Sequence, residues 1–148
     1  MSLSVSNLEN EFLWPVRVYY EDTDSGGVVY YANYLKFMER ARTEMLRSFG
    51  FEQDQLIKEQ GVIFAVHSLS VQYKKPAVFN DELIVKTKIS DCGRASFDFS
   101  QSVYRVLDEA LLCAAEIKVA CINAEKFTPK VIPEKMLSKI KQGVGSGS

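Results

Sequence analysis

Residues 32–50, ANYLKFMERARTEMLRSFG, give the most direct indication of the fold. Their apolar side chains recur every three or four residues and so lie on one helical stripe: Tyr34, Met38, Ala41, Met45 and Phe49. Charged residues with good helix propensity lie between them, and Gly50 follows as a residue that commonly ends a helix. The pattern predicts one long helix over about residues 32–49, with a single buried face.

The segments around this helix alternate as half-buried strands do. One alternating segment precedes the helix at 14–20, and four follow it at 62–73, 82–90, 95–106 and 111–123. A short helix at 54–60 ends at Gly61, and a weak helix is expected at 133–141. Short turns join the last strands, which favours antiparallel neighbours. Because one sheet face must cover the long helix, we expect an α+β domain with a strongly curved antiparallel sheet.

Length and composition bound the function. The 148 residues are 47% hydrophobic and 25% charged with a net charge of −1, which fits a single domain and gives no basic excess for binding nucleic acid. No apolar run approaches the ~18 residues of a membrane span, and a secretory signal is not expected. Three cysteines without a CxxC pair argue against a disulfide framework and favour a reducing compartment. We expect one cytoplasmic domain over residues 12–141, with flexible termini at 1–11 and 142–148.

The loop before the long helix carries the candidate chemistry. Residues 19–34, YYEDTDSGGVVYYANY, place Asp22, Asp24 and two glycines just before the helix begins. A helix N-terminus has unpaired backbone N–H groups and a partial positive charge of roughly +0.5, so it can stabilise negative charge that develops on a carbonyl oxygen. A carboxylate nearby could attack the carbonyl carbon or activate water. An acidic loop before a helix more often forms a cap and a turn than a catalytic site, and the pattern does not say which aspartate faces inward.

Other routes to catalysis find less support in the sequence. His67 is the only histidine, no G-x-S-x-G elbow is present, and its alternating segment favours a packed core or interface residue. Cys113 and Cys121 lie an even number of positions apart in one expected strand, so both are expected to be buried. The charged positions of the long helix, Arg42 among them, are expected on a solvated or intersubunit face. No phosphate-binding glycine loop or dinucleotide fingerprint is found.

Residues 16–30, VRVYYEDTDSGGVVY, together with Ala32, Tyr34 and the run ERARTE at 39–44, resemble a known family. They are similar to the acyl-CoA thioesterases of the 4-hydroxybenzoyl-CoA thioesterase family, in particular the branch associated with the Tol-Pal cell-envelope system. The resemblance runs from about residue 14 to residue 141. It implies the hotdog fold, in which a curved antiparallel sheet wraps a long central helix. It also implies a homotetramer, a dimer of dimers, with sites at the subunit interface.

Matched by position, the resemblance implies a catalytic aspartate at Asp24, an active-site tyrosine at Tyr20 and a carbonyl-polarising backbone N–H at Tyr31. Many relatives in the branch carry histidine at the position of Tyr31. A backbone donor does not depend on the side chain, but a proton-transfer role of that histidine is not carried over. The implied reaction converts acyl-CoA and water to a carboxylic acid and CoA, with Asp24 as nucleophile or as base on water.

CoA would enter as part of the substrate, and neither a separate cofactor nor a metal is expected. The CoA phosphates call for basic side chains, and the loop candidates are Arg94, Lys74, Lys75, Lys126 and Lys130. Arg94 ranks first because relatives also carry a basic residue there. Two alternatives stay open: a hotdog dehydratase acting on 3-hydroxyacyl thioesters, and a non-catalytic module that binds acyl-CoA or acyl carrier protein.

Overall fold

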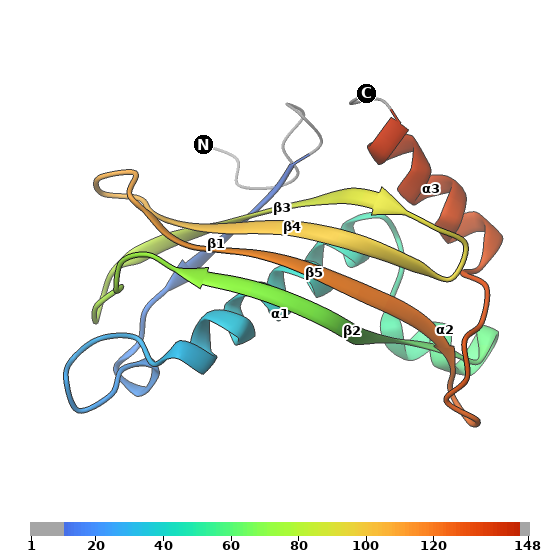
Figure 1. The fold of residues 1–148 in the computed structure, drawn as a ribbon, viewed down its shortest axis with the longest axis horizontal. Helices are drawn as coiled ribbons and strands as arrows, with labels where there is room; N and C mark the ends of the chain where they lie inside the picture. Colours follow the sequence, from blue (N-terminus) through green and yellow to red (C-terminus); the bar gives the residue numbers. More distant parts are fainter. Residues whose placement is uncertain (1–10, 146–148) are drawn as a thin grey trace.

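The computed structural model describes residues 11–145 as one antiparallel sheet with a long helix lying across it (Figure 1). The strands are β1 (Phe12–Arg17), β2 (Val62–Tyr73), β3 (Glu82–Cys92), β4 (Ser96–Arg105) and β5 (Leu111–Asn123). The helices are α1 (Tyr31–Ser48), α2 (Gln53–Gln60) and α3 (Glu134–Gly145), and a single 3-10 turn spans Tyr20–Asp22. The expected α+β class is confirmed.

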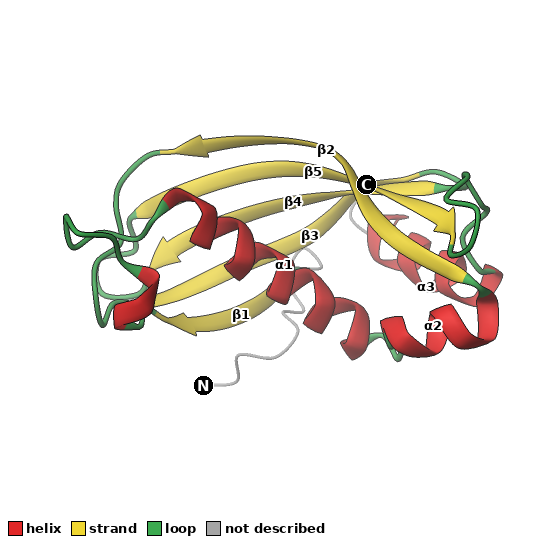
Figure 2. Cartoon of the chain, turned by 90° about the horizontal axis from the view of Figure 1, so that it is seen from below, coloured by secondary structure: helices red, strands yellow, loops and turns green. Residues whose placement is uncertain are grey.

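The sheet has five strands in the order β1-β3-β4-β5-β2, and every pair is antiparallel. β1 and β2 are therefore the two edges. Figure 2 shows α1 crossing one face of the curved sheet, while α2 and α3 lie together at one end. This is the arrangement of the hotdog fold, as the sequence resemblance implied.

The predicted helical stripe forms the centre of the core. Tyr34, Met38, Ala41 and Met45 are all buried, and Phe49, which caps the helix, is half-buried. They belong to one cluster with side chains from the covered sheet face, including Phe97, Phe99, Val85 and Val103. Burial of this apolar face stabilises the helix on the sheet far more than helix propensity does.

A buried polar cluster also ties α1 to the sheet at mid-length. The side-chain amide of Gln101 donates to the Met38 carbonyl and to the Thr87 hydroxyl, both at 2.9 Å, and its oxygen accepts from the Arg42 guanidinium at 2.9 Å. Gln101 and Thr87 are buried. Burial lowers the pKa of Arg42, which is half-buried against the sheet rather than on a solvated face, and the alternative of an intersubunit face stays a prediction.

Two element boundaries differ from the sequence prediction by three residues or more. The first strand ends at Arg17, because the Asp22 carboxylate takes the N–H of Tyr19 at 2.8 Å and the chain then turns into a 3-10 turn. The last helix continues to Gly145 beyond the predicted end at 141, and its buried residues Met136 and Ile140 attach it to the core. Residues 1–10 and 146–148, also predicted to be flexible, lie outside the described residues.

Candidate active site

The segment between β1 and α1 is a loop closed on itself. The Asp24 N–H donates to the Val28 carbonyl at 2.9 Å, and the Gly27 N–H donates back to the Asp24 carbonyl at 3.0 Å. Thr23 and Val29 pair below this turn. Gly27 has a φ of +82°, which glycine adopts without steric strain. The loop therefore presents Asp24 near its tip and returns directly into α1.

The two aspartates of the loop have different environments. Both carboxylate oxygens of Asp22 are engaged, with Oδ2 accepting from the Tyr19 N–H and Oδ1 from the Asn33 side-chain amide, each at 2.8 Å. Asp24 Oδ1 accepts from the Gly26 N–H at 2.8 Å, and the structure gives its Oδ2 no partner among residues 11–145. Asp22 thus fills the cap-and-turn role, while Asp24 is exposed on the single chain and keeps an oxygen available.

The start of α1 leaves a backbone donor available beside this loop. Tyr30, the residue before the helix, provides no side-chain cap, and Tyr31 is the first helical residue, whose N–H has no carbonyl four residues earlier in the helix. The Tyr31 ring is 66% exposed and lies 5.0 Å from the Tyr73 ring, between centroids. The Tyr73 hydroxyl donates to the Tyr31 carbonyl at 3.4 Å. The side chain is therefore turned toward the end of β2, and the Tyr31 N–H has no hydrogen-bond acceptor among residues 11–145.

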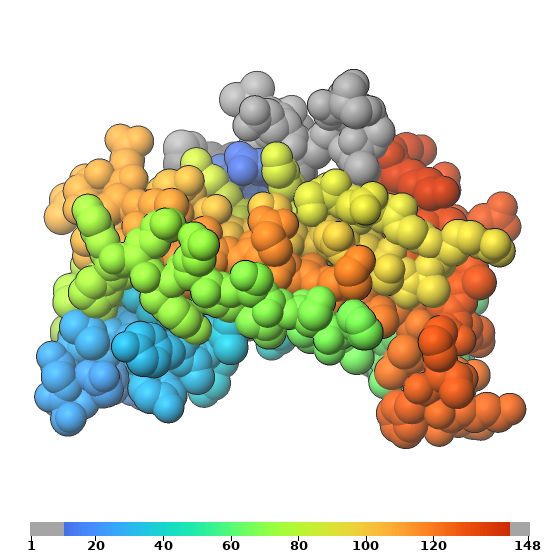
Figure 3. Space-filling model, viewed as in Figure 1, coloured from blue at the N-terminus to red at the C-terminus, as the bar shows by residue number. Residues whose placement is uncertain are grey.

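A hollow of about 250 Å³ lies next to Tyr31. It is lined by Val28, Val29, Tyr31, Tyr34, Tyr73, Lys74, Lys75 and Pro76. Asp24 is not among these lining residues and lies on the loop that leads into Val28. In Figure 3 the blue loop region and the green end of β2 meet on one face of the molecule. Tyr73 was not singled out by sequence, where it was only one member of an alternating strand.

The wall of this hollow is fixed from below by Tyr34. Its hydroxyl oxygen accepts the Ala77 N–H at 2.9 Å, and both residues are buried. Burial raises the pKa of Tyr34, although the Ala77 hydrogen bond opposes it. The Ala77 carbonyl accepts from the Val29 N–H at 2.9 Å. The segment after β2 is therefore attached both to α1 and to the loop that carries Asp24.

Tyr20, the implied active-site tyrosine, lies in the 3-10 turn rather than in a strand. Its ring is 79% exposed and contacts the ring of Phe79 edge-on at 5.7 Å between centroids. The strand predicted over 14–20 therefore does not reach Tyr20, which is exposed, whereas Val18 is buried.

The basic candidates are divided between the two ends of the sheet. Lys74 and Lys75 line the hollow beside Tyr31. Arg94 lies in the β3–β4 turn, where its carbonyl accepts from the Ile132 N–H at 2.8 Å, and Lys130 donates to the Gln60 carbonyl at 2.9 Å. The twelve residues of β2 separate these ends, a span of roughly 40 Å at ~3.3 Å per residue. Within a single chain, Lys74 and Lys75 therefore lie far from Arg94 and Lys130.

The remaining nucleophile and base candidates are two buried thiols, of which Cys113 pairs with Tyr73 beside this hollow, and one exposed histidine. Cys113 and Cys121 are buried as predicted, and burial raises the pKa of each thiol to about 11. His67 is exposed at a bulge of β2, between Val66 and Ser68, where the register against β5 shifts. His67 is therefore not packed in the core of the single chain, and the alternative expectation of an interface residue stays a prediction.

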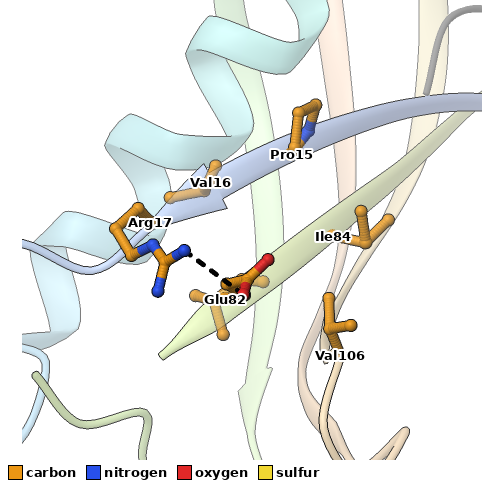
Figure 4. Close-up of a pocket in the computed structure, with 7 residues that line it drawn as sticks. Pro15, Val16, Arg17, Glu82, Ile84 and Val106 are labelled. Atoms are coloured by element: carbon orange, nitrogen blue, oxygen red, sulfur yellow. Dashed lines mark ion pairs between the residues drawn. The ribbon is translucent and has the colours of Figure 1, made fainter. Parts of the chain in front are cut away.

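A second hollow, of about 410 Å³, opens between β1 and β3 (Figure 4). Its lining is apolar apart from the ion pair between Arg17 and Glu82, whose closest atoms are 3.2 Å apart. Both side chains of the pair are exposed. No pattern in the sequence indicates this hollow, and its lining offers no nucleophile beside a base.

Among residues 11–145, none of the helices has both the length and the apolar character that crossing a membrane requires.

Comparisons with known proteins identify related chains and a similar fold. Residues 18–140 match the thioesterase-like superfamily. The acyl-CoA thioester hydrolase YbgC of Escherichia coli is 44% identical over 131 residues, covering 88% of this chain and 96% of that protein. The acyl-CoA thioesterase YbgC of Haemophilus influenzae is 45% identical over 129 residues, covering 87% and 93%. The crystal structure of a probable thioesterase from Bartonella henselae superposes with a TM-score of 0.78 at 36% identity, covering 83% and 99%.

Proposed function

The chain belongs to the thioesterase-like superfamily, and we propose on this premise that it hydrolyses acyl-CoA to a carboxylic acid and CoA. One observation carries the proposal: a closed loop holds an available carboxylate, that of Asp24, and leads within seven residues to the N–H of Tyr31 at a helix N-terminus, which has no acceptor within the described part of the chain. The names of the Escherichia coli and Haemophilus influenzae relatives support the same reaction.

In the proposed mechanism the thioester carbonyl oxygen accepts a hydrogen bond from the Tyr31 N–H. This donor and the helix dipole stabilise the negative charge that develops on the oxygen in the tetrahedral transition state. The ionised Asp24 either attacks the carbonyl carbon, which expels the CoA thiolate and leaves an anhydride for water to cleave, or takes a proton from an attacking water. Tyr20 is the proposed active-site tyrosine, while the Tyr31 ring, packed on Tyr73, takes no part in proton transfer.

We further propose that the enzyme is a homotetramer built from dimers. The edge strand β2 exposes Val66, Leu69 and Tyr73 by 46%, 47% and 43% of their surfaces, and an apolar strand edge favours pairing with a second strand. A two-fold axis makes such a pairing antiparallel. Light scattering should then give a mass of about four times 16.7 kDa, and a mass of one chain at assay concentration would contradict the assembly.

An antiparallel pairing of β2 also accounts for the divided basic residues. It sets the start of β2 in one copy beside the end of β2 in the other. Arg94 and Lys130 of a second copy then approach Lys74 and Lys75 of the first, and the four form one site for the CoA phosphates. Lys126 follows β5 at the same end as Lys130 and is a weaker candidate. The free cysteines Cys92, Cys113 and Cys121 support a place in the reducing cytoplasm.

A substrate panel tests the reaction against its alternatives. The purified chain is given short, long and aromatic acyl-CoAs, and CoA release is followed with a thiol reagent. Release from several substrates is expected. Hydration of an enoyl-CoA would instead support the dehydratase, for which the exposed His67 on β2 is a poor base. Tight binding of acyl-CoA or acyl carrier protein without turnover would support a binding module.

A further inference from the structure

The neck of the loop that carries Asp24 is tied to the first turn of α1 by one residue, Asp22. Its Oδ1 accepts from the Asn33 side-chain amide and its Oδ2 from the Tyr19 N–H, both at 2.8 Å. Its backbone carbonyl accepts from the Tyr30 N–H at 3.1 Å. Asn33 is buried and Asp22 is half-buried, so the hydrogen bond between their side chains is poorly replaced by water, whereas the one from the Tyr19 N–H is exposed.

The chemistry of this contact is selective for a carboxylate at position 22. Both partners of the side chain, a backbone N–H and an amide NH₂, are donors, and only an ionised carboxylate accepts on both oxygens. The amide of an Asp22→Asn variant must aim its own donors at one of these two groups. Hydrogen bonds to an ionised acceptor are also stronger than those between neutral groups.

We propose that Asp22 and Asn33 are positioning residues that fix where the Asp24 carboxylate lies relative to the Tyr31 N–H. Asp24 follows Asp22 by two residues, and Tyr31 precedes Asn33 by two. The hydrogen bond between Asp22 and Asn33 therefore lies two residues from Asp24 in the loop and two residues from Tyr31 in the helix, the two residues of the proposed catalytic pair. The inference rests on the proposed function, in which these two groups must face one carbonyl. Misplacement of a reacting group by about 1 Å costs on the order of 10²-fold in rate.

An exchange of the two side chains tests this role. The variants Asp22→Asn, Asn33→Asp and the double variant Asp22→Asn/Asn33→Asp are compared with the wild-type chain for kcat, KM and thermal unfolding. Each single variant sets two donors or two carboxylates against each other and should lower kcat by roughly 10–100-fold, with KM within about twofold. The double variant exchanges donor and acceptor, so it should recover most of the lost kcat. Asp54→Asn, the same change at an exposed residue of α2, is the matched control and should leave kcat unchanged.

The outcomes separate a positioning role from a structural one. Single variants that unfold at lower temperature yet keep the wild-type kcat would overturn the proposal, and so would a double variant as slow as the slower single variant. If a single variant does not fold, Asn33→Ala removes the contact without adding repulsion and should show the same loss of kcat. Full activity of Asp24→Asn would overturn the proposed catalytic role itself. An inactive Asp24→Asn together with fully active single variants would overturn the positioning role alone.

Discussion

The hydrogen bond from the Ala77 N–H to the Tyr34 hydroxyl gives a stability prediction that the structure makes quantitative. Tyr34→Phe removes only the hydroxyl, so the ring keeps its neighbours Phe37 and Tyr73, whose centroids lie 6.2 and 5.6 Å away. The Ala77 N–H is then left buried without an acceptor. An unsatisfied buried donor costs about 1–3 kcal/mol, so the free energy of unfolding should fall by that amount. Urea unfolding at one fixed protein concentration measures it.

Tyr73→Phe is the matched control, because its hydroxyl makes one long hydrogen bond of 3.4 Å at a half-exposed position. Water can replace that contact, and the expected loss is below about 0.5 kcal/mol. If Tyr34→Phe were as stable as the wild-type chain, the prediction that the buried Ala77 N–H depends on this hydroxyl would be wrong. Equal losses in the two variants would refute it as well.

Three further outcomes are expected. Burial raises the pKa of Cys113 and Cys121 to about 11. As pH rises from about 9 to 11 the unfolded state loses these thiol protons while the folded state keeps them, so the free energy of unfolding should fall. Urea unfolding of a Cys113→Ala/Cys121→Ala variant should show a smaller fall over the same pH range. Lys74→Ala and Lys75→Ala should raise KM for acyl-CoA but not for acyl N-acetylcysteamine, which lacks the phosphates; equal KM changes would contradict a phosphate contact. Gly61→Ala should lower stability by roughly 1 kcal/mol in the same unfolding assay, because Gly61 has a φ of +65° that other residues adopt with strain.

Periodicity predicted the parts of the fold that depend on one buried face. The long helix and its stripe, Gly61 at the end of α2, and the last strand over 111–123 all follow from local spacing. The first strand was drawn too long because a side chain intervened: the Asp22 carboxylate captures the Tyr19 N–H, and no alternation pattern reports that competition. The half-buried position of Arg42 was not predicted for a similar reason, because its hydrogen-bond partner Gln101 is 59 residues away in the sequence.

The site itself could be predicted only in part. The acidic and glycine residues before the helix indicated the loop and the helix N-terminus as a candidate site. The local pattern left Asp22 and Asp24 unresolved and only the family resemblance implied Asp24; the position of Asn33, which engages the Asp22 carboxylate, supports that prediction. The separation of Lys74 and Arg94 was also hidden, because composition does not tell which loops share an end of a sheet.

In the proposed function, the carboxylate of Asp24 acts as nucleophile or base in the hydrolysis of the thioester. Single-turnover release of CoA from an acyl-CoA, with enzyme in excess over substrate, measures this step apart from product release. Asp24→Asn should slow this release by roughly 10²–10⁴-fold, while the variant should unfold at the wild-type temperature. A rate equal to that of the wild-type chain would contradict it.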